Sequence, residues 1–422
     1  MLVKLLSTVT AVMLLSAGQA SADSGHLGRQ TLGARDGWAA ATTGTTGGSP
    51  ATRDHVYTVD NRAELVAALA DTESKIVYVR GTIEGNTDDL DRPLGCDQYA
   101  DPGYSLAAYL AQYDPATWGR TDPAGPLEEA RARSQANQAK RVVVPVKSNT
   151  TIVGLGDDAT MLGLTLRVSG ADNVIIRNLR FEDAYDCFPQ WDPTDGDTGN
   201  WNSEYDNLVL TGATHVWVDG CEFSDGGNTS QPVYFGRKYE VHDGLLDVVN
   251  GSDLVTLSYN NFHDHDKSIL IGNTDRPTYD VGKLRVTMHH NLFENLGSRV
   301  PRVRYGQVHV YNNLYVVPFT NSYEYSWGIG IESKIYAENN FFQVGRGVMP
   351  GTFAKWWKGT ALHATGTLMN WRPVDVVAEH NAVYDPDLGV DVGWTPTLAP
   401  RVYPTALVPL RVRVHAGVGR NR

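Results

Sequence analysis

The stretch VTMHHNLF at residues 286–293 is followed by VHVYNNLY at residues 308–315, and the two align column for column. Columns one and three are apolar, column six is Asn and column eight is aromatic. Five further segments follow the pattern: VIIRNLRF (174–181), VWVDGCEF (216–223), VTLSYNNF (255–262), IYAENNFF (335–342) and VVAEHNAV (376–383). Alternating apolar residues over a few positions are typical of a strand. The repeat therefore predicts seven short strands in register.

Column six carries the most specific signal. It holds Asn260, Asn291, Asn313, Asn340 and Asn381, with Leu179 and Cys221 in the first two segments. A buried amide must find hydrogen-bond partners, so an amide at a constant column predicts a ladder of stacked Asn side chains. Short stacked strands with such a ladder indicate a parallel β-solenoid. A β-sandwich has similar strand spacing but does not explain the Asn column.

The flanking sequence predicts how the solenoid begins and ends. Residues 61–70 are expected to form a short capping helix, with Asn61 as N-cap and Glu64 completing a capping box. Residues 127–140 favour a surface helix. The spacing from Asn291 to Asn313 is enough for one coil, and the longer spacings between the other repeats require loop insertions on one side of the coils. The tail beyond Asp385 has no helical period and is expected to pack back along the coils. The predicted fold is all-β, with residues 23–422 forming one domain.

The segment of residues 1–22 is typical of a secretory signal peptide, with Lys4, an apolar run over residues 9–15 and a final Ala-Ser-Ala. No later segment is long and apolar enough for a membrane span. We therefore expect a secreted, extracellular protein with no membrane partner. The net charge of −12 argues against nucleic-acid binding. Among the three cysteines, Cys96 and Cys187 lie in turn-rich segments and are the favoured disulfide pair, which leaves Cys221 as a buried thiol.

Two neighbouring insertions are rich in carboxylates. Glu204 and Asp206 are two positions apart, and Asp243 and Asp247 share parity in the next insertion. If adjacent coils stack, the two pairs meet across a strand spacing of about 5 Å. Carboxylates so close cannot all stay ionised without a counter-charge, and calcium suits an irregular set of oxygen ligands. The alternative is an ordinary solvated acidic surface.

The following insertions carry cations, and the clustered histidines favour structural roles beside the ladder. Arginine binds carboxylates in a two-pronged manner and lysine acts as a point charge. These side chains therefore suit an acidic polysaccharide, although part of them could be ordinary salt-bridge partners. The cations are Lys267, Arg276, Lys283, Arg299, Arg302 and Arg304.

The segments VWVDGCEF, HDGLLD, DHDKS and SRVPRVR, in this order, resemble the extracellular pectate lyases of polysaccharide lyase family 1. The similarity runs from about Gly37 to Gly330, includes GWAAATTGTTGG, TIVGLGD, WDPTDG and GQVHVYNN, and is strongest to the Bacillus-type alkaline enzymes. It implies a right-handed parallel β-helix that cleaves α-1,4-linked polygalacturonate by calcium-dependent β-elimination. It also implies a monomer.

The resemblance assigns roles to residues that match the family motifs. Asp206, Asp243 and Asp247 correspond to primary calcium ligands, and Glu204 to a carboxylate that helps hold further calcium with substrate. Lys267 corresponds to the lysine that grips a uronate carboxylate. In the R-x-P-x-x-R pattern, Arg299 corresponds to the proposed base, Pro301 to the fixed turn and Arg304 to a substrate or structural arginine. An arginine base implies an alkaline optimum.

One departure from the family pattern concerns the W-x-D-H signature, because Gly220 stands where the family has His. Rival functions remain at this point: a pectin lyase acting on methylated pectin without calcium, a hydrolytic polygalacturonase with paired acids, and a non-catalytic β-helical polysaccharide-binding protein.

Overall fold

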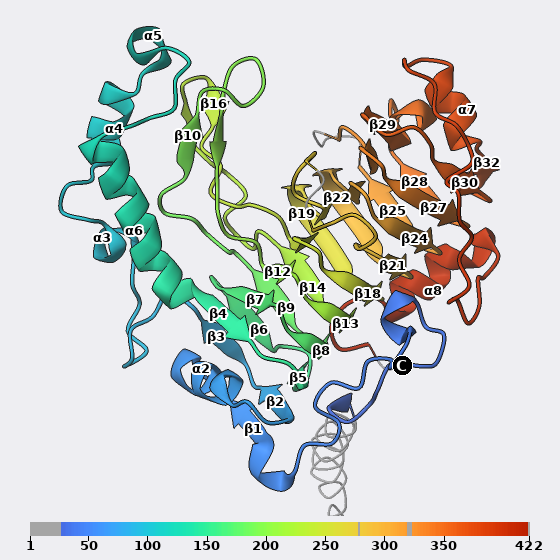
Figure 1. Ribbon diagram of the computed structural model, residues 1–422, viewed down its shortest axis with the longest axis horizontal. Coiled ribbons are helices and arrows are strands. Elements are labelled where there is room, and N and C mark those ends of the chain that lie inside the picture. The colour runs from blue at the N-terminus through green and yellow to red at the C-terminus, as the bar shows by residue number, and fades with distance from the viewer. Residues whose placement is uncertain (1–26, 277–278, 319–322, 421–422) are drawn as a thin grey trace, which may run out of the picture.

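The computed structural model describes residues 27–276, 279–318 and 323–420, which wind into a parallel β-helix (Figure 1). Three sheets run along the coils, and each strand pairs in parallel with the equivalent strand of the next coil, except for the terminal β32, which pairs antiparallel with β31. The predicted solenoid is therefore confirmed. The predicted signal peptide, residues 1–22, lies outside the described residues.

The first two sheets have ten strands each. The first contains, in order, β1 (Val56–Val59), β2 (Lys75–Val79), β5 (Thr150–Gly154), β8 (Asp172–Arg177), β13 (Thr214–Asp219), β18 (Asp253–Ser258), β21 (Val286–His289), β24 (Gln307–Tyr311), β27 (Lys334–Glu338) and β30 (His363–Thr365). The second contains β3 (Thr82–Glu84), β6 (Thr160–Leu162), β9 (Arg180–Glu182), β14 (Glu222–Ser224), β19 (Asn261–Lys267), β22 (Leu292–Ser298), β25 (Leu314–Val317), β28 (Phe341–Val344), β31 (Leu368–Met369) and β32 (Arg372–Pro373).

The third sheet has eight strands and borders the candidate site. Its strands, from the N-terminal end of the stack, are β4 (Val143–Val146), β7 (Thr165–Ser169), β12 (Leu208–Thr211), β17 (Leu246–Val249), β20 (Leu270–Ile271), β23 (Arg302–Val303), β26 (Trp327–Gly330) and β29 (Ala354–Trp357).

The repeated eight-column segment spans the turn from the first sheet to the second. Its fifth column takes a left-handed backbone conformation in these coils, with φ between 51° and 62°. A left-handed residue reverses the chain direction sharply, and Asn and Gly tolerate it best. The residues at this column are Asn178, Gly220, Tyr259, His290, Asn312 and Asn339.

The predicted amide ladder is present at column six from Asn260 to Asn340, but the inclusion of Asn381 was wrong, because its side chain bonds to Leu388. Asn260, Asn291, Asn313 and Asn340 are fully buried. The Asn291 side-chain oxygen accepts from the backbone N–H of Asn260 at 2.9 Å and from its amide at 3.1 Å. The Asn291 amide donates in turn to Asn313 Oδ1 at 3.0 Å and to the Leu257 carbonyl at 3.0 Å. An Asn inside the ladder thus satisfies buried polar groups of the preceding coil and of the next coil.

Column eight forms an aromatic stack inside the coils. Phe181, Phe223 and Phe262 lie with successive ring centroids 4.8 Å apart and planes within 8° of parallel. The stack continues through Phe293, Tyr315 and Phe342, with successive centroids between 4.4 and 5.4 Å apart. Tyr315 also contacts the segment that leads into the third sheet, because its hydroxyl donates to the Val300 carbonyl at 3.3 Å.

Helices close both ends of the stack. The predicted N-terminal cap is α2 (Arg62–Ala70), where the Asn61 side chain accepts from Glu64 N and Leu65 and Leu69 enter the core. The prediction of a seventh strand at residues 376–383 was wrong, because this segment forms α7 (Val376–Asn381). Asp375 caps this helix, and Val376 and Val377 are buried over the last coils. An end coil has no neighbour beyond it, so its apolar face needs a cap and not another strand.

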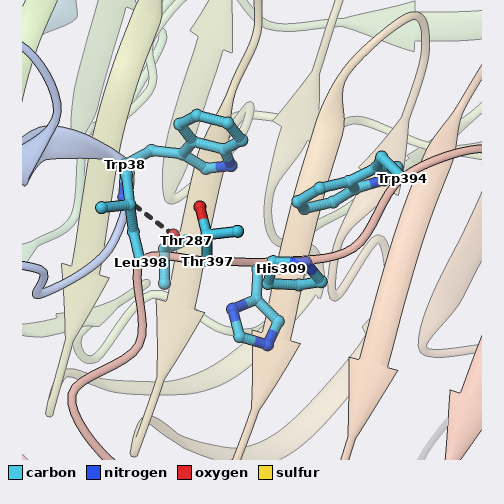
Figure 2. Close-up of a pocket in the computed structure, with 7 residues that line it drawn as sticks. Trp38, Thr287, His309, Trp394, Thr397 and Leu398 are labelled. Carbon is cyan, nitrogen blue, oxygen red and sulfur yellow. Dashed lines mark hydrogen bonds between the residues drawn. The ribbon is translucent and has the colours of Figure 1, made fainter.

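The C-terminal tail does pack back along the coils, but the expectation that it lacks a helix was wrong. Its helix α8 (Val408–His415) buries Val408 and Val412 against Leu292, Leu314 and Phe341. The preceding strap crosses the outer face of the first sheet, and Figure 2 shows its Thr397 and Leu398 beside Trp38, Thr287 and His309. The space enclosed there is about 10 Å³, enough for a single water.

The insertions form a wall on one side of the stack (Figure 1). The wall contains helices α3 (Cys96–Tyr99), α4 (Leu106–Gln112), α5 (Pro115–Trp118) and α6 (Pro126–Val142), with the hairpins β10 (Gln190–Asp192)–β11 (Asn200–Asn202) and β15 (Val233–Tyr234)–β16 (Arg237–Lys238). Tyr109, Trp191 and Trp201 give the wall a small aromatic core of its own. The predicted Cys96–Cys187 disulfide is present and ties two of its segments together, while Cys221 is buried among the coils. None of the helices in the described part of the chain combines the length and apolar character that crossing a bilayer requires.

The ladder predicts a large stability cost for Asn291→Ala. The substitution leaves the backbone N–H of Asn260 and one of the two N–H groups of its side-chain amide buried without acceptors, so we expect a loss of about 3 kcal/mol in the free energy of unfolding. Chemical denaturation of wild type and variant measures it. The control is Asn273→Ala at an exposed position, which should change stability by less than about 0.5 kcal/mol. Equal small effects for both variants would contradict a structural ladder.

Candidate active site

The candidate site lies where the chain passes from the second sheet to the third. An open groove of about 850 Å³ runs along this edge of the stack, between the insertion wall and the C-terminal coils. Arg237, Lys238 and Glu240 line it on the wall side, and Tyr325 and Trp357 line it on the other. Lys267, Arg299, Arg302 and Arg304 line its floor.

Two of the predicted calcium ligands converge from adjacent coils. Asp206 precedes β12 and Asp247 lies in β17, and these strands pair in parallel. Both carboxylates face Gly244: the Gly244 N–H donates to Asp206 Oδ1 at 2.7 Å, and the position of a Cβ on Gly244 would lie 2.6 Å from Asp247 Oδ1 and 2.8 Å from Asp206 Oδ1. Only glycine leaves room between them. The parity argument from sequence thus identifies side chains that are brought together.

Burial and mutual repulsion disfavour the ionised forms of both groups. Asp206 and Asp247 are each 7% exposed. Burial, then the neighbouring Asp247 and Asp243, raise the pKa of Asp206 well above its ordinary value. Burial and Asp243 raise the pKa of Asp247 to about 7. The pair therefore needs a proton or a bound cation to balance it near neutral pH.

Asp243, the third predicted ligand, is paired with a lysine. Lys267 Nζ lies 2.9 Å from Asp243 Oδ1 and 3.3 Å from Glu240 Oε2. Burial lowers the pKa of Lys267, but Asp243 and Glu240 outweigh it and raise that pKa overall, so Lys267 is charged. Among the described residues, no three carboxylate, imidazole or thiolate side chains are arranged as a ready metal site. Asp243 would have to turn from Lys267 to join the other two.

Arg299 is held by the coils on either side of it. Its carbonyl accepts from Ile269 N at 2.7 Å, and the next residue, Val300, donates to the Ser326 carbonyl at 2.7 Å. Its backbone is left-handed, with φ of 58°, a sparsely populated conformation for a residue with a side chain that is often found at functional sites. Its guanidinium makes no ion pair within the described residues. Burial lowers the pKa of Arg299, but Asp243 and Asp247 raise it overall.

Arg302 is a groove residue to which the sequence assigned no specific role. Its guanidinium lies 4.1 Å from the centroid of Trp357, and Nε is buried without a hydrogen-bond partner in the described part of the chain. Burial, with Arg304 and Arg299 nearby, lowers the pKa of Arg302 to about 10. Strand alternation could have identified it, because Arg302 lies in register with Leu270, whose N–H donates to Asp247 on the preceding coil. A stacked cation without a carboxylate partner is a site for an anion.

Two other predicted site residues lie outside this cluster of free charges. Arg304 lines the groove, but its Nε donates to Asp275 at 2.7 Å and its Nη1 to the Gly272 carbonyl at 2.7 Å. Its guanidinium is therefore engaged in holding the neighbouring turn. Glu204 is exposed, whereas Asp206 is buried, so the two do not share one environment.

Gly220, which replaces the family His, is remote from the groove. It occupies the left-handed column between the first and second sheets, with φ of 62°. Lys267 ends the second-sheet strand β19, so the two turns are separated by the length of that strand, or about 20 Å. Asp219 beside it is engaged by Arg177 at 2.6 Å and Trp217 by Ser258 at 2.9 Å. The glycine fits the turn without strain.

The groove is open and runs along a parallel β-helix, and it holds unpaired guanidinium groups beside crowded carboxylates. These features are typical of a β-helical protein that binds an extended acidic polymer. The comparisons agree. A family model described as pectate lyase matches residues 124–357. The pectate lyase of Bacillus subtilis (strain 168) is 49% identical over 424 residues, covering 99% of each chain.

Two solved structures extend the similarity to three dimensions. A pectate lyase bound to a hexasaccharide is 49% identical, with a TM-score of 0.90 over 94% of this chain and 100% of that chain. A thermostable pectate lyase is 45% identical, with a TM-score of 0.92 over the same shares. The chain belongs to the pectate lyase family, and it is a polysaccharide lyase.

The raised pKa of Asp247 predicts how stability depends on pH in the presence of a chelator. Its folded pKa of about 7 exceeds the unfolded value of 3.8, so its stabilising proton is fully bound below about pH 4 and lost as pH rises through 7. We expect Asp247→Asn to stabilise the protein at pH 8 by on the order of 3 kcal/mol relative to its effect at pH 4. Thermal unfolding at both pH values measures this difference.

The control for this prediction is Asp122→Asn, at an exposed position, which should give no pH-dependent difference. Addition of calcium should raise the melting temperature of the wild type and of the control but have little effect on Asp247→Asn. A stability difference that is the same at pH 4 and pH 8 would contradict the crowded carboxylate pair.

Proposed function

We propose that the protein is a secreted, monomeric pectate lyase that cleaves α-1,4-linked polygalacturonate by calcium-dependent β-elimination, giving 4,5-unsaturated products. The observation that carries the proposal is the buried Asp206–Asp247 pair beside the unpaired guanidinium groups of Arg299 and Arg302. The identity to relatives named pectate lyase over nearly the whole chain supports the reaction type. The signal-like pattern of residues 1–22 supports secretion.

Calcium fits the donors that the chain offers. Asp206 and Asp247 provide hard carboxylate oxygens that are too crowded to carry full charge alone. Asp243 can complete the set when a substrate carboxylate takes over Lys267. Glu204, which is exposed and lies two positions before Asp206 in the sequence, is available to a further calcium with substrate bound. Bound calcium would supply positive charge that acidifies the C5 proton of a uronate by neutralising its carboxylate.

The cations of the groove hold the substrate. Lys267 and Arg302 can each neutralise a uronate carboxylate, and Arg302 is kept in a fixed orientation by Trp357. Arg304, although engaged by Asp275, lines the same groove and contributes to the positive field. A methyl ester carries no charge, so this set of cations favours pectate over methylated pectin. A hydrolase would instead need a general acid and a general base on either side of the bond.

Arg299 acts as the base that removes the C5 proton. Its guanidinium is presented to the groove by a backbone held between two coils. Neutralisation of Asp243 and Asp247 removes the two interactions that raise its pKa most and leaves burial, which lowers it. Arg299 in its neutral form takes the C5 proton, the electron pair of the C5–H bond forms the C4–C5 double bond, the bond from C4 to the glycosidic oxygen breaks, and that oxygen takes a proton from water. Lys267 stabilises the charge that develops on the carboxylate.

One assay separates this function from its rivals. Polygalacturonate and methylated pectin are incubated with the protein, with and without a chelator, and ultraviolet absorbance is followed. A pectate lyase raises the absorbance when it acts on polygalacturonate, and the chelator abolishes this rise. A pectin lyase would prefer the methylated polymer and ignore the chelator, a polygalacturonase would cleave without absorbance, and a binding protein would not cleave.

Arg299→Lys is predicted to lower kcat at least a hundredfold while substrate affinity changes less than threefold. An ammonium group keeps the charge but cannot reach the proton in the same geometry. Absorbance kinetics give kcat, and titration with oligogalacturonate gives affinity. The matched control, Arg53→Lys at an exposed position, should behave as wild type. Normal turnover in Arg299→Lys would exclude Arg299 as the base.

Arg302→Ala is predicted to raise KM for polygalacturonate about tenfold with little change in kcat. The substitution removes a guanidinium that binds a substrate carboxylate and takes no part in breaking the bond. Arg302→Lys should recover only part of the affinity, since lysine lacks the planar group that stacks on Trp357 and binds in a two-pronged manner. A fall in kcat at unchanged KM would show that Arg302 acts on the transition state instead.

A further inference from the structure

A second pocket lies beyond the C-terminal end of the groove. It has a volume of about 500 Å³ and is lined by β29, by α7 and by the residues that follow α7. Glu324 lines both this pocket and the groove. The two spaces are therefore neighbours along the same edge of the stack.

A buried histidine in the wall of this pocket indicates a binding site. His380 is 1% exposed, and its Nδ1 lies 3.1 Å from the Ala354 carbonyl. A carbonyl only accepts, so Nδ1 carries a proton and donates it. Nε2 then offers a lone pair, and it has no hydrogen-bond partner within the described residues. A buried acceptor left without a donor costs free energy, which a ligand hydroxyl would recover.

The other walls supply what a sugar ring requires. Trp356 is 39% exposed and Tyr384 is 44% exposed, so both present ring surface to solvent. Lys355 and Asp385 add a cation and an acceptor. Lys355 Nζ also lies 5.2 Å from the ring centroid of Tyr325 and 5.0 Å from that of Trp357, which are groove residues. Lys355 thus stands at the junction of the two spaces.

Strand register fixes the distance from the carboxylate pair to this pocket. Asp247 accepts from Leu270 N, Leu270 pairs with Arg302, Arg302 with Gly328, and Gly328 with Lys355. These four steps along the stack amount to about 19 Å. A polymer lying along the third sheet from Asp247 would reach the pocket several sugar units from the cleaved bond.

We propose that this pocket is an accessory subsite for a non-reacting uronate unit of the same polymer chain. Trp356 and Tyr384 contact the sugar ring, His380 Nε2 accepts from a hydroxyl, and Lys355 exchanges Glu324 for the uronate carboxylate. The subsite rests on the proposed function, since it binds a distant part of the same substrate. It gives the enzyme a preference for long chains over short ones.

The test compares Trp356→Ala and Tyr384→Ala with wild type on polygalacturonate and on trigalacturonate. A trimer that spans from Asp247 to Arg299 ends two coils, or about 10 Å, before the pocket. We expect KM for the polymer to rise roughly five- to tenfold in each variant, while kcat/KM for the trimer stays the same. The control is Trp371→Ala, whose side chain is 64% exposed and lies outside the pocket, and which should change neither substrate.

A second measurement removes dependence on turnover and on the stability of the single variants. In an Arg299→Lys background, calorimetric titration should show that Trp356→Ala weakens hexagalacturonate binding and leaves trigalacturonate binding unchanged. Unchanged polymer kinetics and hexamer affinity, or equal losses for long and short ligands, would overturn the subsite. A wild-type protein that forms no unsaturated product from either substrate would instead overturn the proposed function.

Discussion

The parallel hydrogen bonding between coils is the constraint on which the rest of this structure depends. Each strand repeats at a fixed spacing of about 4.8 Å, so every column of side chains is forced into a line of near contacts. Inside the stack this produces the Asn ladder and the aromatic column, both favourable. At the edge of the stack the same spacing forces Asp206 toward Asp247, which is unfavourable without a counter-charge. The stability of the interior therefore compensates for the electrostatic repulsion at the site.

The inner columns also position the site directly. Tyr315 belongs to the aromatic column, receives a hydrogen bond from Trp327 Nε1 at 2.9 Å and donates one to the Val300 carbonyl. Val300 follows Arg299, so the turn that presents the guanidinium is anchored from within the core. The wall opposite is stabilised separately, by its aromatic cluster and by the disulfide between Cys96 and Cys187. The groove thus lies between the coils and the insertion wall, which are stabilised by different interactions.

Sequence patterning predicted the features that obey strand periodicity. The coils, the ladder through Asn340 and the N-cap at Asn61 follow from local rules, and the structure contains them. The seventh repeat failed because VVAEHN fits a strand or a helix, and only the absence of a further coil to pair with decides for α7. The helix in the tail was missed for a related reason, since Val408 and Val412 are selected by the surface they cover. The tertiary environment decided both.

The candidate site was predictable in its residue types but not in its pairings. Column parity identified Asp206 and Asp247 as neighbours, yet no pattern indicates that Asp243 pairs with Lys267 or that Asp275 engages Arg304. Which charges stay unpaired is a property of the folded surface, and it separates Arg302 from Arg304 although both belong to one short segment. For an acidic polymer this distinction matters more than the count of cations. A guanidinium already neutralised by a carboxylate attracts the polymer weakly, whereas one stacked on a tryptophan ring keeps its full charge for the substrate.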